Sequence, residues 1–326
     1  MYSLLKYILF KLNPETAHQL SLILLSIAHR LGLTHFFKTP INNPIMLMGI
    51  SFPNKIGLAA GLDKNADYLS ALASLGFGFI EVGTITPKPQ AGNPKPRLFR
   101  LIKEKALINR MGFNNKGMDY VANRLEKTNY QGILGINIGK NKDTPPEKAV
   151  DDYIACFRKL WKYASYVTIN ISSPNTPGLR DLHQIDALTT LLSTLKKEQL
   201  AVASQKYVPL VVKISPDLSE EALADTAAVL LEQKIDGVIA TNTTLDKSAV
   251  SGSVFASEAG GLSGAPLKTS STKVVEKLNH LLKGSIPIIA SGGIMDNQAI
   301  EEKYQAGASL VQVYTGLIYN GSFFAK

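Results

Sequence analysis

After residue 44 the chain alternates short, largely apolar runs with longer amphipathic segments. The apolar runs cover residues 56–60, 79–83, 134–138, 167–171, 210–214, 237–241, 287–290 and 310–314. Segments with helical periodicity lie between them, among them residues 67–75, 150–163, 188–195, 220–233 and 272–282. Strands that are apolar throughout are typical of parallel sheets covered on both faces. Eight strand–helix units therefore predict an α/β fold, a (β/α)₈ TIM barrel.

Two long insertions interrupt this repeat. Within residues 87–118, the segments 97–102 and 105–109 have the pattern of a hairpin, and residues 244–268 are rich in Gly and Ser. Few residues follow the last apolar run, so we expect no full closing helix at the end of the barrel.

The N-terminal segment predicts two helices outside the barrel. Residues 1–12 carry apolar side chains at helical spacing, and Asn13, Pro14 and Glu15 have the pattern of a helix start. The apolar run 20–28 is shorter than the roughly 20 residues that span a bilayer. A signal peptide is less expected, because charged residues interrupt the stretch. A hairpin packed on the barrel is slightly favoured over one whose apolar face enters a membrane interface.

Polar residues gather where the predicted strands end, which is where barrel enzymes place their active sites. Lys213 lies inside an apolar run and is expected to face the interior, where a cation could stabilise an anionic reduced ring. Lys64 follows the first strand at the predicted mouth. Amides, which offer both donors and acceptors, recur at strand ends and suit a flat heterocycle with amide and carbonyl groups; they are Asn109, Asn137, Asn170, Asn175 and Asn242.

Glycine-rich turns follow the last two strands, at residues 291–293 and 314–316, and a third lies at residues 260–264. Barrels commonly bind a phosphate there through backbone N–H groups. Glycines also end strands for purely local reasons. The three turns together favour a ligand that carries a phosphate.

The loop after the fourth strand supplies two hydroxyl groups, Ser173 and Thr176. Serine is a weak base, so a catalytic Ser173 needs a proton relay. No Ser-His-Asp pattern and no metal-ligand spacing accompanies it, and His183 is expected at the surface. Cys156 is the only cysteine, which excludes an intramolecular disulfide and a Cys₄ metal site and fits a reducing cytoplasm.

The chain of 326 residues is basic, with a formal charge of +9, and 45% of its residues are hydrophobic. A basic excess is compatible with nucleic acid, an anionic membrane surface or acidic substrates. Nucleic acid is the weakest of these, because no dense Lys/Arg cluster with interleaved aromatic residues occurs.

Four motifs together resemble the dihydroorotate dehydrogenase family: residues 57–64, 109–114, 170–178 and 240–244. The resemblance covers nearly the whole chain. It implies a barrel that binds FMN at the strand ends and oxidises dihydroorotate to orotate in pyrimidine synthesis. Ser173 would remove the C5 proton while a hydride passes from C6 to the flavin, with Thr176 as relay partner.

The resemblance also assigns the binding residues. It assigns FMN to Ala60, Gly61, Leu62, Asp63, Lys64, Thr84, Asn137, Asn170, Lys213, Thr241, Gly264, Gly293, Tyr314 and Thr315. It assigns orotate to Lys64, Asn109, Arg110, Met111, Gly112, Phe113, Asn170, Asn175, Asn242 and Thr243.

A serine in place of a cysteine base, together with the N-terminal helices, resembles the quinone-reducing class. This implies a membrane-associating extension, residues 1–36, beside an FMN-binding barrel, residues 37–326. His18, Arg100 and Tyr314 would line a quinone tunnel. The resemblance implies a monomer at the cytoplasmic face of the cell membrane. Two alternatives stay open: another FMN- or phosphate-binding barrel enzyme, such as a lyase or a different oxidoreductase, and a membrane-associated binding protein that has lost catalysis.

Overall fold

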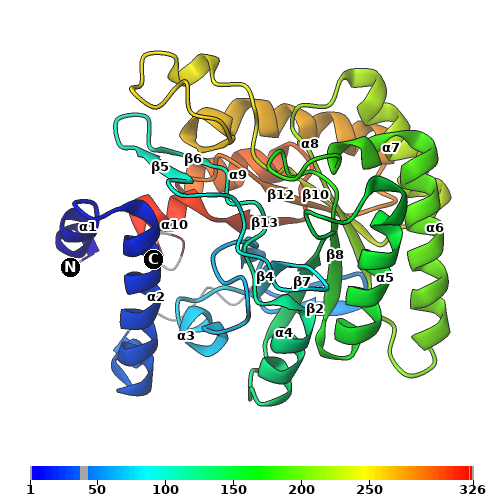
Figure 1. Cartoon of the computed structure of the whole chain (residues 1–326), viewed down its shortest axis with the longest axis horizontal. Helices are drawn as coiled ribbons and strands as arrows, with labels where there is room; N and C mark the ends of the chain where they lie inside the picture. The colour runs from blue at the N-terminus through cyan, green and yellow to red at the C-terminus, as the bar shows by residue number, and fades with distance from the viewer. Residues whose placement is uncertain (1, 37–42, 323, 325–326) are drawn as a thin grey trace.

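The computed structural model describes residues 2–36, 43–322 and 324. Its centre is a closed barrel of eight parallel strands, which confirms the predicted fold (Figure 1). Around the barrel the strands are β3 (Ile56–Leu58), β4 (Phe79–Ile85), β7 (Ile133–Ile138), β8 (Tyr166–Asn170), β9 (Leu210–Ile214), β10 (Gly237–Ala240), β12 (Ile288–Ser291) and β13 (Leu310–Val313). The barrel closes where β13 pairs with β3.

Helices follow the strands and cover the barrel from outside. They are α3 (Leu69–Ala73), α4 (Gly117–Glu126), α5 (Ala149–Leu160), α6 (Ile185–Val202), α7 (Glu220–Glu232), α8 (Lys268–Leu282), α9 (Asn297–Gln305) and α10 (Thr315–Asn320). Side-chain caps begin two of them: Ser219 accepts from the Ala222 N–H, and Asp296 accepts from the Ala299 N–H. Cys156 lies buried in α5, on the apolar face that packs against the barrel.

A short hairpin, β1 (Ile45–Leu47) and β2 (Ile50–Phe52), closes the N-terminal end of the barrel. Phe52 contacts the ring of Phe79 edge-on, with ring centroids 5.3 Å apart, at the base of β4. Tyr166 and Leu310, at the bases of β8 and β13, complete the same apolar cluster. The strand ends that carry the polar residues are therefore the open end of the barrel.

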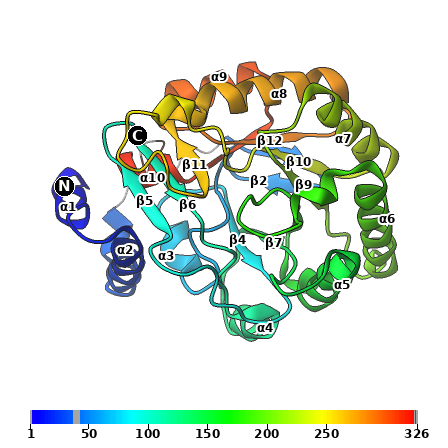
Figure 2. The ribbon, with the colours of Figure 1, turned by 45° about the horizontal axis from the view of Figure 1, so that its top comes forward.

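The two insertions combine over that open end. The predicted hairpin is confirmed as β5 (Leu98–Leu101) and β6 (Ala106–Asn109). The Gly/Ser-rich insertion, for which no strand was predicted, adds β11 (Gly261–Gly264) as a third, antiparallel strand beside β6. Figure 2 shows this small sheet above the barrel mouth.

The two predicted N-terminal helices are α1 (Tyr2–Leu9) and α2 (Pro14–Arg30), at the left of Figure 1. A buried ion pair joins α2 to the insertion, because Arg97 Nη2 lies 2.7 Å from Glu15 Oε1. Near α1, the Phe10 ring lies between Arg100 and Tyr319. In the described part of the chain, no helix is long and apolar enough to cross a membrane. Residue 37, where the predicted barrel unit begins, lies outside the described residues.

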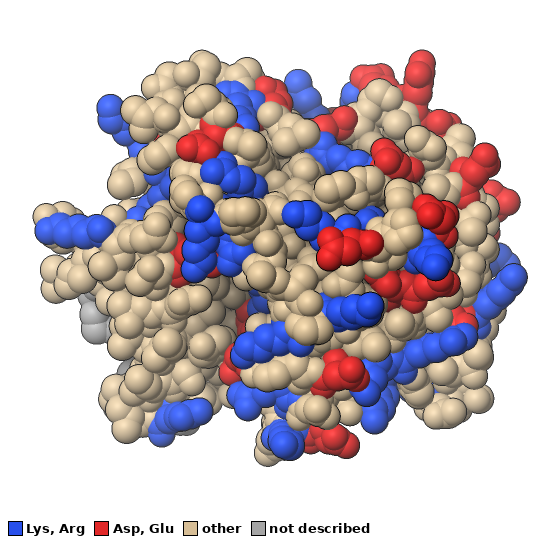
Figure 3. Space-filling view, viewed as in Figure 1, with Lys and Arg blue, Asp and Glu red and all other residues tan. Residues whose placement is uncertain are grey.

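The outer faces of these helices are apolar. Their exposed large side chains include Leu4, Leu5, Tyr7 and Ile8 on α1 and Leu20, Ile23, Leu24 and Ile27 on α2. Figure 3 shows a mostly uncharged surface at the left, over α2, whereas Lys and Arg alternate with Asp and Glu elsewhere on the same face.

Candidate active site

One pocket opens at the C-terminal ends of the barrel strands and gathers most of the predicted site residues. From the predicted cofactor set its wall includes Ala60, Gly61, Lys64, Thr84, Asn170, Lys213, Thr241, Gly264, Gly293, Tyr314 and Thr315. From the predicted substrate set it includes Asn109, Met111, Gly112, Phe113, Asn175, Asn242 and Thr243. Ser173 and His18 line it as well.

Some predicted contacts lie behind that wall instead. Asp63 is buried, and its carboxylate accepts from the backbone N–H groups of Asn65, Asp67 and Tyr68. It therefore shapes the loop that presents Lys64. Leu62 is buried beside it in the apolar core. Asn137 is fully buried behind Thr84, and Thr176 is buried in the loop after β8.

Two arginines are held by partners outside the pocket wall. Arg110 Nη1 lies 2.6 Å from Glu258 Oε2, an ion pair between the two insertions. Arg100 stacks over Phe10 and donates to the Phe10 carbonyl oxygen at 3.0 Å. Burial lowers the pKa of Arg100 from its ordinary value.

A network of amides and hydroxyls forms the inner wall between β4 and β10. Asn170 Nδ2 donates to Thr84 Oγ1 at 2.9 Å and to Asn137 Oδ1 at 3.2 Å. Asn242 Nδ2 donates to Ser172 Oγ at 3.0 Å. The predicted convergence of asparagines is confirmed for these members, and each amide holds its neighbour in one orientation.

Lys213 faces the barrel interior, as predicted, and it lines the pocket. Among the described residues it donates no hydrogen bond and lies within ion-pair distance of no carboxylate. Burial lowers its pKa, and the charge of Glu81 acts in the opposite direction. Gln312 Oε1 is likewise buried without a partner in the described part of the chain. A cation and an acceptor left unpaired in one pocket indicate a polar ligand.

A backbone cradle lies at the β12 and β13 side of the pocket. Gly264 and Gly293 both have positive φ, 98° and 73°, which glycine adopts without strain. A Cβ on Gly293 would lie 2.2 Å from Lys268 Cα, at the start of α8. Ser263 Oγ and Thr315 Oγ1 are hydrogen-bonded at 2.9 Å beside it. The three predicted glycine turns thus meet in one place, with a geometry suited to a phosphate.

Ionisable residues line the side of the pocket nearest α2. Lys64 Nζ donates to the Gly61 carbonyl oxygen at 2.7 Å, and burial lowers its pKa to about 8, against the charge of Glu15. Burial and the nearby Lys64 charge lower the pKa of His18 to about 3, so this imidazole is neutral at physiological pH. Burial raises the pKa of Tyr314 to about 12.

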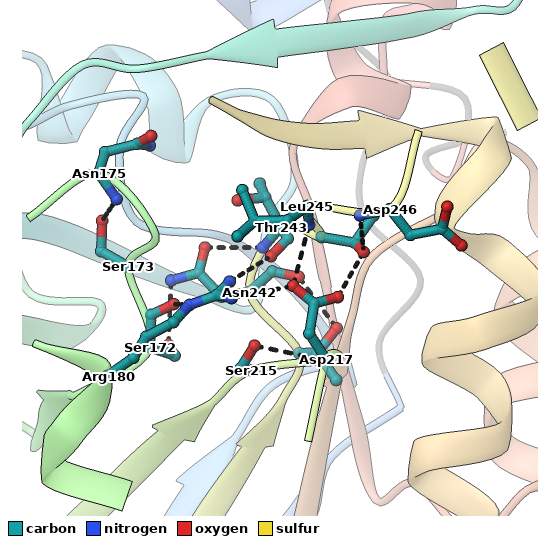
Figure 4. A network of polar contacts seen from close by, with 12 residues as sticks. Ser172, Ser173, Asn175, Arg180, Ser215, Asp217, Asn242, Thr243, Leu245 and Asp246 are labelled. Carbon is teal, nitrogen blue, oxygen red and sulfur yellow. Dashed lines mark hydrogen bonds and ion pairs between the residues drawn. The ribbon is translucent and has the colours of Figure 1, made fainter. Parts of the chain in front are cut away.

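The loop that carries Ser173 is tied to its neighbours by Arg180 and Asp217 (Figure 4). Ser173 Oγ accepts from the Asn175 N–H at 3.3 Å. Arg180 Nη1 lies 3.0 Å from Asp217 Oδ2, which also accepts from the Leu245 N–H at 2.9 Å. Asp217 Oδ1 accepts from the Thr244 hydroxyl. One carboxylate therefore joins the loops after β8, β9 and β10, a role that no sequence motif indicated.

The expectation that His183 lies at the surface is wrong. The side chain is buried at the end of the same loop, and both ring nitrogens lack a hydrogen-bond partner among the described residues. Burial and the charge of Arg180 lower its pKa to about 4. A neutral, buried imidazole packs here as part of the loop's support.

Residues 44–326 match the model of the dihydroorotate dehydrogenase family. The chain belongs to this family. It is 56% identical over 324 residues to the dihydroorotate dehydrogenase (quinone) of Cellvibrio japonicus, covering 98% of this chain and 95% of that relative. It is 55% identical over 328 residues to the enzyme of the same name from Acinetobacter baumannii, covering 100% and 98%.

A solved dihydroorotate dehydrogenase has the same architecture. The crystal structure of the Eimeria tenella protein in complex with ferulenol matches with a TM-score of 0.87 and 40% identity. The match covers 98% of this chain and 91% of that one. The N-terminal helices are therefore part of the similarity to this family member, in addition to the barrel.

Proposed function

We propose that this protein is a quinone-dependent dihydroorotate dehydrogenase, a flavin-dependent oxidoreductase that oxidises dihydroorotate to orotate in pyrimidine synthesis. The observation that carries the proposal is the convergence of Ser173, Lys213 and the amide network in one pocket at the barrel mouth. The relatives that are 55–56% identical over nearly the full chain are named dihydroorotate dehydrogenase (quinone).

FMN is the cofactor that fits the pocket. The glycine cradle beside Ser263 and Thr315 suits its phosphate, and the buried, unpaired Lys213 suits the electron-rich edge of its ring. When bound, FMN supplies a two-electron acceptor for the substrate hydride and a donor for the quinone. Ala60, Thr84 and Thr241 would border it along the strand ends.

The amide wall is proposed to bind the substrate. Asn109, Asn170, Asn175 and Asn242 present donors and acceptors that match the carbonyl and N–H groups of a pyrimidine ring. Lys64 supplies a cation for the substrate carboxylate. Asn175 Nδ2 already donates to the Asn109 carbonyl oxygen at 3.1 Å, so two sides of the pocket approach each other across this space.

Ser173 is proposed as the base that removes the C5 proton. The hydroxyl must pass a proton onward, because a serine alone holds one poorly. Thr176, buried three residues later in the same loop, is the proposed partner in a water-linked relay. Arg180 and Asp217 would hold that loop over the substrate.

The N-terminal helices are proposed to meet the membrane. Residues 1–36 would form the extension and residues 37–326 the FMN-binding barrel of a monomer at the cytoplasmic face. The exposed apolar side chains of α1 and α2 would enter the lipid interface. His18 and Tyr314, which line the pocket, and Arg100, which stacks on Phe10, would border the quinone path.

One anaerobic titration tests the central proposal. The purified protein should be yellow, and dihydroorotate should bleach its flavin absorbance. A yellow protein that does not respond would indicate a different flavin-dependent barrel enzyme. If the purified protein is colourless, and added FMN restores neither its colour nor its activity, a flavin enzyme is excluded. A flavin-free, phosphate-binding barrel enzyme and the binding protein then remain.

A further inference from the structure

Glu81 is a fully buried carboxylate at the centre of the barrel, on β4. Its Oε1 accepts from Asn137 Nδ2 at 2.8 Å. Its Oε2 accepts from three donors on β8 and β13: the Tyr166 hydroxyl at 3.0 Å, the Thr168 hydroxyl at 3.1 Å and Gln312 Nε2 at 2.8 Å. Burying an anion is unfavourable unless hydrogen bonds replace the lost water. Four donors from three strands meet that condition, so Glu81 holds this part of the barrel in one arrangement.

An ionised carboxylate only accepts hydrogen bonds, so the group facing it must be a donor. Asn137 therefore turns its NH₂ toward Glu81 and its carbonyl oxygen away from it. That oxygen accepts from the Thr84 hydroxyl at 2.6 Å and from Asn170 Nδ2 at 3.2 Å. The orientation of Asn137 thus follows from the charge of Glu81.

Asn170 connects Asn137 to the pocket wall. Since Asn170 turns its NH₂ toward Thr84 and Asn137, its Oδ1 points to the other side. There it accepts from the Ser172 hydroxyl at 3.1 Å and from the Ser172 backbone N–H at 3.3 Å, and it faces Asn242 Nδ2 at 3.5 Å. Asn170 and Asn242 both line the pocket, whereas Glu81 and Asn137 lie behind it.

We propose that Glu81 is a positioning residue that fixes the orientation of the Asn137 amide and, through the contact of Asn137 with Asn170, supports the donor and acceptor pattern presented to the substrate. The inference rests on the proposed function, since it names a second layer behind the proposed substrate-binding wall. Glu81 does not touch the substrate, and its effect reaches the pocket through Asn137 and Asn170.

The variant Glu81→Gln tests the direction of the network. Three donors still face the Oε2 side, so the new carbonyl oxygen belongs there and the new NH₂ faces Asn137. Asn137 must then turn its oxygen inward and its NH₂ toward Asn170 Nδ2. Because the Ser172 N–H holds Asn170 Oδ1, two donors then face each other and the contact between the two amides is lost. We expect folded, yellow protein whose Kd for orotate, read from the orotate-induced change in the flavin spectrum, rises roughly 10- to 100-fold.

Tyr166→Phe is the matched control. It removes one donor to Glu81 Oε2 but keeps the charge and the Oε1 contact with Asn137. Its Kd for orotate should stay within about threefold of the original, as expected when no amide reverses. Equal losses in the two variants would show that Glu81 acts only through barrel packing and would overturn the proposal.

The exchange Glu81→Gln with Asn137→Asp tests it independently. The carboxylate introduced at position 137 accepts from the amide introduced at position 81, from Thr84 and from Asn170. The network therefore keeps its original direction with the same net charge. We expect this double variant to recover orotate binding to within about threefold. This arm also decides the matter if the single variant does not fold. A double variant that does not fold, or folds without recovering binding, overturns the proposal.

The failure of this inference differs from the failure of the proposed function. An unaltered protein that binds no flavin, or whose flavin does not respond to orotate, would reject the proposed function. An unaltered protein that responds, beside a Glu81→Gln variant that responds equally well, would reject only the role of Glu81.

Discussion

The barrel mouth and the N-terminal helices differ in the kind of group that lacks a partner. In the mouth, polar atoms are buried and pair with one another, and the groups without a partner among the described residues include a cation and an acceptor, Lys213 and Gln312 Oε1. On α1 and α2, the groups left over are apolar side chains exposed to water, such as Ile23 and Ile27. Each region thus indicates the environment that would complete it: a charged heterocycle in the first, a lipid interface in the second.

The largest effect is expected from a substitution that removes the proposed base at the barrel mouth and leaves flavin binding intact. Ser173→Ala should keep the flavin but slow its reduction by dihydroorotate by roughly 10³-fold or more, because the proposed base is gone. Stopped-flow absorbance under anaerobic conditions measures this rate. Thr176→Val should give a smaller loss if it acts in the relay. Reduction at the original rate in Ser173→Ala would place the base elsewhere.

A smaller loss of activity is expected when the pocket residues stay in place but the ion pair that joins the surrounding loops is removed. Asp217→Asn removes the ion pair with Arg180 and should lower kcat/KM for dihydroorotate by roughly 10- to 30-fold, with flavin content unchanged. A cycle with Arg180→Met should be non-additive, because both changes remove the same contact.

The control for this tie is an ion pair of similar geometry far from the pocket. Arg158 Nη2 lies 2.7 Å from Glu198 Oε1, between α5 and α6. Glu198→Gln should leave kcat/KM unchanged, since an exposed pair contributes little. If Glu198→Gln and Asp217→Asn lower kcat/KM equally, the loops after β8 to β10 are not held in the proposed way.

Charged substitutions on the N-terminal helices should weaken membrane binding and leave the chemistry at the barrel mouth unchanged. Ile23→Glu with Ile27→Glu places two carboxylates on the outer face of α2 and should reduce binding to phospholipid vesicles by roughly tenfold or more. Turnover with a long-tailed quinone in the vesicles should fall in parallel, while anaerobic flavin reduction stays unchanged.

Leu200→Glu on α6 is the control for that experiment. Leu200 is 60% exposed, more than Ile23 at 46% or Ile27 at 47%, but it lies on the opposite side of the barrel from α2 (Figure 1). It should not alter vesicle binding. A similar loss in Leu200→Glu would mean that added charge alone, and not the face of α2, governs association.

The smallest expected effect is a pH dependence at the boundary between the two regions. Burial lowers the pKa of Lys64 to about 8, so this group is charged below that pH and neutral above it. The affinity for the orotate anion should therefore fall as pH rises, by about fourfold between pH 7 and 8.5. Lys64→Met should bind more weakly at pH 7 and lose this dependence. An unchanged slope in Lys64→Met would assign the titration to another group.

The fold was predictable because its main signal is local. Each barrel strand is a largely apolar run, and the predicted bounds of each run are close to the observed ones. The hairpin β1–β2 was not predicted, because its strands span only three residues each, too few to show a period. β11 was missed for a different reason. Its Gly and Ser residues have little strand preference, and it forms because β6 offers a free edge.

The site was predictable only where position along a strand determines it. Lys213 was expected to face inward because its neighbours are apolar, and it does. Glu81 lies within the predicted strand 79–83, but its role depends on partners 56 to 231 residues away in sequence. His183 was placed wrongly since a short 3₁₀ turn gives no periodicity from which to read the buried face.

The buried ion pair between Glu15 and Arg97 fixes α2 to the insertion over the barrel mouth. If the outer face of α2 enters a lipid interface as proposed, this attachment would hold the mouth close to the lipid. A lipid-soluble oxidant would then reach it by lateral diffusion in a plane. Its rate of arrival would depend on the number of molecules per unit area of membrane, and no longer on the concentration in bulk solution.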